Sequence, residues 1–210
     1  MAPQRVRRTP TQERSKALVE AVLDATARVL VEEGYDTAST NRIAKRAGVS
    51  VGSLYQYFPD KRACVEALAE RHLERELATV LEGFVAYANQ PIDVLTRALV
   101  EALVAAHRVD PELHRVLVSQ TPTDVAASLR TRIEAVLRAD MERRAAAGEN
   151  RILDADVAAY VVVAAVDGAI LGALERRPDL LQDNRLVDAL TELVLRYCLP
   201  VHDPQPHRAR

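Results

Sequence analysis

Apolar residues recur at helical spacing along nearly the whole chain, and no segment alternates apolar and polar residues as a half-buried strand does. In the segment 11–33, one helical face is formed by Leu18, Val22, Ala25, Val29 and Leu30. The chain has 210 residues, 49% of them hydrophobic and only seven of them glycine, so it can bury a sizeable helical core. The sequence therefore predicts an all-α fold.

Glycine, proline and capping residues divide this pattern into helices. Thr9 can cap a first helix at 11–33, Pro10 suits its first turn, and Gly34 suits its end. Further helices are expected at 40–47, 51–57, 61–87, 92–108, 111–118, 122–147, 153–176 and 183–199. Ser39 or Thr40, Ser50 and Asp60 are the expected caps of the second, third and fourth helices. Two short helices joined by a three-residue turn containing glycine form a helix-turn-helix pattern.

Charge is distributed unevenly along the chain, whose formal net charge is −2. Residues 1–61 hold 10 Lys and Arg against 7 Asp and Glu, whereas residues 62–210 hold 18 against 23. A small basic head on an acidic body is typical of a DNA reader, although chance asymmetry would give the same balance.

Residues 51–58 have two different helical faces. Leu54 and Phe58 lie four residues apart and are expected to form a small core with Ile43, Ala44, Ala47 and Val49. The other face is small or hydrogen-bonding and carries no charge: Val51, Gly52, Ser53, Gln56 and Tyr57. Ser53 and Gln56 can bond base edges, and Tyr55, Tyr57 and Lys61 can bond phosphates. The alternative is a solvated helix pair with incidental tyrosines.

The segment TNRIAKRAGVSVGSLYQYFPDK resembles the helix-turn-helix signature of tetracycline-repressor-like (TetR family) regulators. The resemblance extends from about Ser15 to Leu68. It implies an N-terminal three-helix DNA-binding domain at 11–60 and a C-terminal helical bundle at 61–200 for ligand binding and dimerisation. The phosphate contacts that it implies are Thr40, Tyr55, Tyr57 and Lys61. The base readers that it implies are Asn41 or Arg42, Val51, Gly52, Ser53 and Gln56.

Both chain ends are polar. The arm 1–10 carries Arg5, Arg7 and Arg8 and is expected to be either a minor-groove contact or, preferably, a disordered tail. Residues 201–210 are expected to be disordered.

The body is expected to dimerise through its last two long helices, at Gly168, Leu171, Gly172, Leu190 and Val194. The rival interpretation is that these residues belong to the core of a single chain. The resemblance also implies an effector site inside the body. Its candidate lining residues are Phe84, Tyr87, Leu103, His107, Gln120, Asp124, Ser128, Tyr160, Val163 and Asp167. Asp167 lies in an apolar helix and needs a partner if it is buried, either a neighbouring group in the chain or a cationic ligand.

The predicted function is a ligand-responsive transcriptional regulator, most simply a repressor, that binds a palindromic operator as a homodimer and is released by a small molecule. An activator of the same fold is the main alternative. A helical-bundle enzyme is disfavoured, because none of the five histidines follows a glutamate by three residues and no HExxH, P-loop or GxSxG motif is present. We therefore expect no catalytic residues, cofactor or metal. We expect no membrane partner, because Asp167 interrupts the most apolar stretch, and the scarcity of cysteine favours a reducing cytoplasm.

Overall fold

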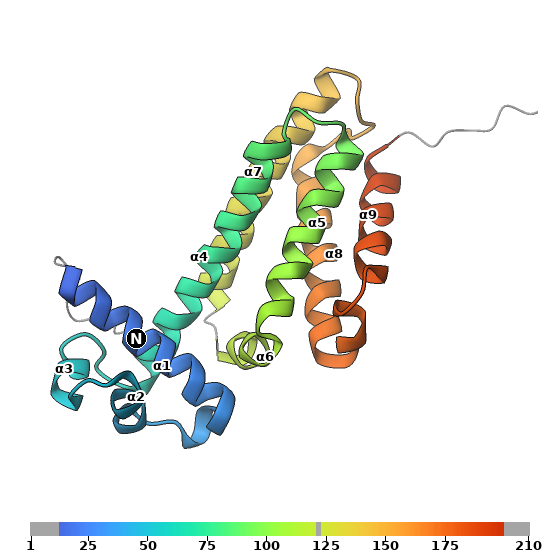
Figure 1. Ribbon diagram of the computed structural model, residues 1–210. Helices are drawn as coiled ribbons and strands as arrows, with labels where there is room; N and C mark the ends of the chain where they lie inside the picture. Colours follow the sequence, from blue (N-terminus) through green and yellow to red (C-terminus); the bar gives the residue numbers. More distant parts are fainter. Residues whose placement is uncertain (1–12, 121–122, 200–210) are drawn as a thin grey trace, which may run out of the picture. The chain divides into compact units, whose positions relative to one another are not determined.

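The structure is a computed structural model that describes residues 13–120 and 123–199, and all regular structure within these ranges is helical. The helices are α1 (Glu13–Thr37), α2 (Thr40–Ala47), α3 (Val51–Tyr55), α4 (Lys61–Tyr87), α5 (Ile92–Val109), α6 (Pro111–Gln120), α7 (Thr123–Ala146), α8 (Ala155–Arg176), the 3₁₀ helix η1 (Pro178–Leu181) and α9 (Arg185–Cys198) (Figure 1). The all-α prediction is confirmed. The predicted arm 1–10, the cap at Thr9 and the tail 201–210 lie outside the described residues.

The chain forms two compact units, each built from separated stretches of sequence. The first unit comprises Met1–Leu77 and Val109–Leu129, and the second comprises Ala78–Arg108 and Arg130–Arg210. The first unit thus combines α1, α2, α3 and the first turns of α4 with α6. The predicted boundary between residues 60 and 61 separates a DNA-binding domain from a ligand-binding and dimerisation domain. It divides the chain by function, and it stays a prediction.

Local capping signals fix the short helices of the first unit. The Ser39 hydroxyl accepts a hydrogen bond from the Arg42 N–H at 3.4 Å, and the Ser50 hydroxyl accepts one from the Ser53 N–H at 3.0 Å. The Asp60 carboxylate accepts one from the N–H of Ala63 at 2.8 Å. These three predicted caps are therefore confirmed.

Two glycines interrupt the helices where the sequence places them. Gly48 ends α2 in the left-handed conformation, with φ 69°. Gly34, with φ 75°, breaks the regular geometry of α1, and helical hydrogen bonding resumes after it as far as Thr37. The expected end of the first helix at residue 33 is thus a break, and the helix as a whole continues for one more turn.

Helix α3 ends two residues earlier than predicted. Its last residue is Tyr55, because the backbone then tightens: the Tyr57 N–H donates to the Leu54 carbonyl, three residues back, at 3.0 Å. The Phe58 N–H donates to the same carbonyl at 2.9 Å. The predicted end of this helix at Tyr57 is therefore two residues too late, although the bond from Phe58 to Leu54 keeps the four-residue spacing of an α-helix.

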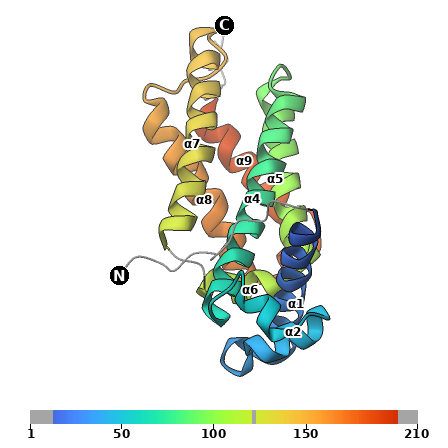
Figure 2. The same ribbon diagram turned by 90° about the vertical axis from the view of Figure 1, so that its left-hand side faces the viewer.

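The core of the first unit is built around Phe58, which is fully buried. Ile43, Ala44 and Leu54 share this core, and Ala47 and Val49 pack against it half-buried. The predicted small core between α2 and α3 is therefore confirmed. Residues of α1, α4 and α6 complete it: Val22, Leu23, Ala25, Val29, Leu30, Ala63, Cys64, Val65, Leu68, Ala69 and Leu117. Figure 2 shows α6 beside α1, and these two helices are in contact.

The second unit packs α5, α8 and α9 side by side (Figures 1 and 2). Its larger cluster is apolar and includes Val104, Met141, Ile170, Leu174 and Val187. A smaller cluster joins α4, α5 and α7 through Val80, Phe84, Leu95 and Leu99, with Ile133, Val136 and Leu137 against it. These helices therefore bury continuous apolar stripes, as their periodicity predicts.

Arg144 is the most buried arginine that the structure describes in the second unit, with only 2% of its side chain exposed. It donates to Asp140 at 2.8 Å and to Glu149 at 2.9 Å, and to the carbonyls of Ala88 and Gln90, each at 3.0 Å. Arg144 thereby ties the end of α7 to the loop between α4 and α5.

Helix α8 is unusually apolar. Asp154 caps it by accepting from the N–H groups of Asp156 and Val157, each at 3.1 Å. Among the described residues, α8 alone is long and apolar enough to cross a bilayer by length and composition, and 39% of its most apolar window is buried in the chain. Core helices of globular proteins pass the same test, so this is weak evidence for a membrane. The 3₁₀ helix η1, which follows α8, was not predicted, because Pro178 reads as a simple break.

Candidate nucleic-acid interface

The candidate DNA-reading surface consists of α2, α3 and the turn that joins α3 to α4. Asn41, Arg42, Gly52, Tyr55 and Gln56 are exposed on it. Thr40, Val51, Ser53 and Lys61 are half-buried. Within this surface, Gly52, Tyr55 and Gln56 form an exposed, uncharged strip. Leu54 and Phe58 are buried in the core behind it.

Gly52 lies on this strip without any internal requirement for glycine. Its backbone is not left-handed, and a Cβ built on it would meet only the Ser50 hydroxyl, at 3.9 Å, which is an ordinary contact. The fold would accept a side chain here, so the absence of one leaves the backbone open to close approach by something outside the chain.

Tyr55 and Thr40 join the two short helices at the surface. The Tyr55 hydroxyl lies 3.0 Å from the Thr40 hydroxyl, and either oxygen can be the donor. Tyr55 is 41% exposed. The hydroxyl that accepts in this bond keeps its own hydrogen free to donate to a phosphate oxygen, which suits the predicted backbone contacts.

Tyr57 lies elsewhere than expected. Its side chain is only 6% exposed and belongs to the core of the first unit. Tyr57 follows Leu54 by three residues, and residues at this spacing share a helical face, so its ring packs in the same core as Leu54 and Phe58. The predicted outward placement is therefore corrected, and a phosphate contact from Tyr57 remains untested.

Lys61 is held in place by Tyr35, at the end of α1. Its ammonium donates to the Tyr35 carbonyl at 2.7 Å and lies 4.2 Å from the centroid of the Tyr35 ring. The sequence analysis assigned no role to Tyr35, so it did not predict this contact. The charge of Lys61 is therefore positioned before any DNA binds.

Other polar groups of the surface also have partners within the chain. Arg42 pairs with Glu33, and Arg46 pairs with Glu32, which ties α2 to α1. The Ser53 hydroxyl lies 2.8 Å from the Ser50 hydroxyl. Burial beneath the surface raises the pKa of the Cys64 thiol to about 12, so this cysteine is an inert core residue.

The effector candidates are divided between the units. Gln120 and Ser128 belong to the first unit, and the side chain of Asp124 lies outside the described residues. In the second unit, Phe84 lies in the smaller cluster with Leu103 packed against it. The remaining candidates of the second unit differ in burial: His107 and Val163 are buried, Tyr87 and Tyr160 are exposed, and Asp167 is half-buried.

Two of these candidates already have partners within the chain. The Asp167 carboxylate accepts from Arg130 at 2.8 Å, so the partner expected for this carboxylate is an arginine on α7. The Nδ1 atom of His107 donates to the Leu103 carbonyl at 2.8 Å.

The dimerisation candidates also fall into two groups. Leu190 and Val194 are buried in the larger cluster of their own chain, and Leu171 and Gly172 are half-buried. Gly168 is exposed, and a Cβ added there would meet nothing within 4 Å. Large apolar side chains are exposed on the same two helices, namely Val157, Tyr160, Val161 and Leu193. The sequence places Val157, Val161 and Leu193 in the apolar stripes of these two helices, but which part of a stripe is exposed depends on how α8 and α9 pack.

Two family models match the chain. The model of bacterial regulatory proteins of the tetR family matches residues 22–68, and the model of the tetracyclin repressor-like C-terminal domain matches residues 91–197. The first match contains α2, α3 and the buried core beneath them, and the second covers about half of the chain.

Curated proteins and solved structures also resemble the chain. The nucleoid occlusion factor SlmA of Glaesserella parasuis is 34% identical over 86 residues, which are 41% of each chain, so the chain spans about two fifths of this relative's length. A tetR-family transcriptional regulator from Streptomyces coelicolor superposes with a TM-score of 0.62 at 26% identity, over 86% of this chain and 96% of that one. SmeT, the repressor of a Stenotrophomonas maltophilia multidrug efflux pump, superposes with a TM-score of 0.68 at 20% identity, over 90% and 94%. SmeT is also known as a complex with triclosan.

Proposed function

The chain belongs to the tetR family of bacterial regulatory proteins and is a DNA-binding transcriptional regulator, and from this premise we propose that it is a repressor that binds a palindromic operator as a homodimer and leaves it when a small molecule binds. The observation that carries the proposal is the strip formed by Gly52, Tyr55 and Gln56, which is exposed while Leu54 and Phe58 hold it from below. We assign the chain no catalytic role, and we propose the cytoplasm as its compartment because its target is DNA.

The strip fits the major groove in its dimensions and chemistry. A groove about 12 Å wide admits one helix, and base edges are read there by amide and hydroxyl groups. Gln56 offers an amide, and Gly52 permits close approach of the backbone. The Thr40 and Tyr55 hydroxyls, 3.0 Å apart, are proposed to contact a phosphate. The Lys61 charge adds a phosphate contact at the start of α4.

Selection of bound duplexes from random-sequence DNA tests the proposed operator binding. A homodimer of two such heads should recover a palindrome whose half-sites lie about one helical turn apart or a multiple of it. Recovery of no consensus would contradict sequence-specific binding, and a single half-site would contradict the paired arrangement.

The dimer is proposed from the exposed apolar surface of α8 and α9. Tyr160 is 61% exposed, and Val157, Val161 and Leu193 are exposed on the same helices. A contiguous apolar surface marks an interaction site, and Gly168 allows a partner helix to come close. The second copy of the chain is the partner that a palindromic operator requires.

Sedimentation analysis of Tyr160→Glu tests the dimer. We expect the variant to be a monomer with a preserved helical circular dichroism spectrum, because a carboxylate buried in an apolar interface is costly. Ala139→Glu, at an exposed position of α7, is the matched control and should remain a dimer. A dimeric Tyr160→Glu variant would place the interface elsewhere.

The effector is proposed to bind in the second unit, near the α4, α5 and α7 cluster that contains Phe84 and Leu103. SmeT, a repressor of the same fold, binds triclosan, so apolar aromatic compounds are the first class to test. The measurement is release of a labelled operator, found by selection, as compound is added. A compound panel that leaves operator affinity unchanged would contradict ligand release while leaving DNA binding intact.

A further inference from the structure

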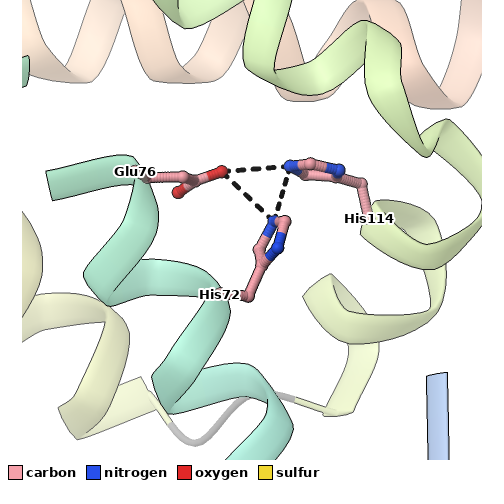
Figure 3. A group of neighbouring side chains, drawn as sticks. All are labelled: His72, Glu76 and His114. Atoms are coloured by element: carbon pink, nitrogen blue, oxygen red, sulfur yellow. Dashed lines mark hydrogen bonds and ion pairs between the residues drawn. The ribbon is translucent and has the colours of Figure 1, made fainter. Parts of the chain in front are cut away.

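Three side chains in the first unit converge on one point, and the DNA-binding role does not use them. His72 and Glu76 lie one turn apart on α4, and His114 reaches them from α6 (Figure 3). The Nε2 atoms of the two histidines are 2.7 Å apart. The Glu76 Oε1 atom lies 3.0 Å from His114 Nε2 and 3.4 Å from His72 Nε2. All three donor atoms therefore lie within one small triangle.

His114 also makes a hydrogen bond through its other ring nitrogen. His114 Nδ1 lies 3.2 Å from the carbonyl of Asp110, and a carbonyl oxygen can only accept, so Nδ1 carries the proton. Its Nε2 atom faces both His72 and Glu76, and the side chain is only 4% exposed. A cation placed among the three donor atoms would attract all of them.

We propose that His72, Glu76 and His114 bind one divalent transition-metal ion of the Zn²⁺ class. A point equidistant from the three donor atoms lies about 1.8 Å from each in their plane, so an ion at the usual bond length of about 2.0–2.1 Å sits about 1 Å above that plane. An ion there keeps at least one coordination position open to water or another ligand. Two imidazoles and one carboxylate suit Zn²⁺, Ni²⁺ or Co²⁺ and do not suit Mg²⁺ or Ca²⁺, which prefer oxygen ligands.

The surroundings of His114 resemble the outer shell of a metal ligand. Donation of the second ring N–H to a backbone carbonyl fixes the tautomer and the ring orientation of metal-binding histidines. The carbonyl belongs to Asp110, whose carboxylate accepts from the Leu113 N–H at 3.0 Å at the start of α6. The ring is therefore held by the same residue that fixes the beginning of its helix.

Bound metal would join α6 to α4 within the unit that contains α2 and α3. Leu117, one turn after His114, lies in the core of this unit with Phe58, so α6 is part of its packing. This inference does not depend on whether the chain is a repressor or has an organic effector. Because a pre-formed site binds the folded chain alone, a hundredfold excess of metal over Kd should raise Tm by about 5–10 °C.

The test uses the untagged full chain, stripped with a chelator and then titrated with ZnCl₂, with metal content measured by elemental analysis after gel filtration. We expect one ion per chain and the stated rise in Tm. Glu76→Gln keeps the size of the side chain and removes its charge, and it should weaken binding about tenfold or more. Glu74→Gln, at an exposed position on the same helix, is the matched control and should bind as the wild type does.

Two further variants separate this site from other histidines. His72→Gln should lose the ion while its metal-free Tm reports whether it folds. Replacing both tail residues, His202 and His207, by alanine should leave binding unchanged. The proposal is overturned if the chain retains no Zn²⁺, if Glu76→Gln binds as Glu74→Gln does, or if loss of the tail histidines abolishes binding.

Discussion

Replacing Gly52 by alanine separates what the fold needs from what DNA reading needs. The new methyl would lie 3.9 Å from the Ser50 hydroxyl, with no nearer neighbour outside its own helix backbone, so it fits without displacement. Alanine is favoured over glycine within a helix by roughly 0.5–1 kcal/mol, and less at the end of a short helix such as α3. One kcal/mol corresponds to about 2–4 °C in a protein of this size, so Tm should stay unchanged or rise by up to about 4 °C.

Operator affinity of Gly52→Ala should fall although the protein is at least as stable. If the strip enters a groove, the methyl holds the helix away from the bases, and we take the cost to be like that of a mismatched base pair, about 1–3 kcal/mol. This corresponds to a loss of roughly 5- to 150-fold in affinity. The assay is fluorescence anisotropy at constant salt on the operator recovered by selection, together with a thermal melt.

Gly48→Ala is the matched control, because it reverses both expectations. Gly48 has φ 69°, and a side chain in this left-handed conformation costs roughly 1–2 kcal/mol, so Tm should fall by about 2–8 °C. The folded fraction should bind the operator nearly as the wild type does. A Gly52→Ala variant that binds normally, or that loses stability as Gly48→Ala does, would refute the role assigned to Gly52.

Three further outcomes follow from single positions. Gln56→Ala should change stability by no more than about 0.5 kcal/mol and relax base preference at one operator position, which a repeated selection with an unchanged consensus would contradict. Because burial raises the pKa of the Cys64 thiol to about 12 from an ordinary 9.0, the folded state keeps this proton longer than the unfolded state. The free energy of unfolding should therefore decline as pH rises from about 9 towards 12, and native Cys64 should resist iodoacetamide at pH 8.5 until denaturant is added. Arg144→Met should lower the free energy of unfolding, measured by urea denaturation, by about 3–5 kcal/mol, and the exposed Arg143→Met should lower it by at most about 1 kcal/mol. Equal losses would contradict a stabilising role for the buried contacts of Arg144.

The parts of the fold that the sequence predicts best are those set by local chemistry. Ser39, Ser50 and Asp60 cap the helices that follow them, because a short oxygen-bearing side chain meets N–H groups only two or three residues away. The contacts of Leu54 and Phe58 follow from their spacing of one helical turn. These features depend on few residues and little on the rest of the chain.

Contacts between distant residues could not be predicted. Arg144 lies in a charged run that reads as a solvated face, and only folding brings the Ala88 and Gln90 carbonyls to it, more than fifty residues away. His114 meets Glu76 across a separation of 38 residues, and none of the usual metal-binding spacings includes such a pair. Tyr57 is a failure of another kind, since its spacing of three residues from Leu54 already indicates the core position that the structure shows.

The internal contacts of the reading surface rank its residues by the cost of engaging DNA. Arg42 must leave or share Glu33 before it reaches a phosphate, and the Ser53 hydroxyl must do the same with Ser50. Such exchanges replace one polar contact by another and contribute little net free energy. Gly52 and Gln56 are exposed on the same strip, and a Cβ at Gly52 would meet only the Ser50 hydroxyl, at the ordinary contact distance of 3.9 Å. Sequence preference should therefore depend more on these two positions than on Arg42 or Ser53, and the Lys61 charge, already held by Tyr35, should act on every sequence alike.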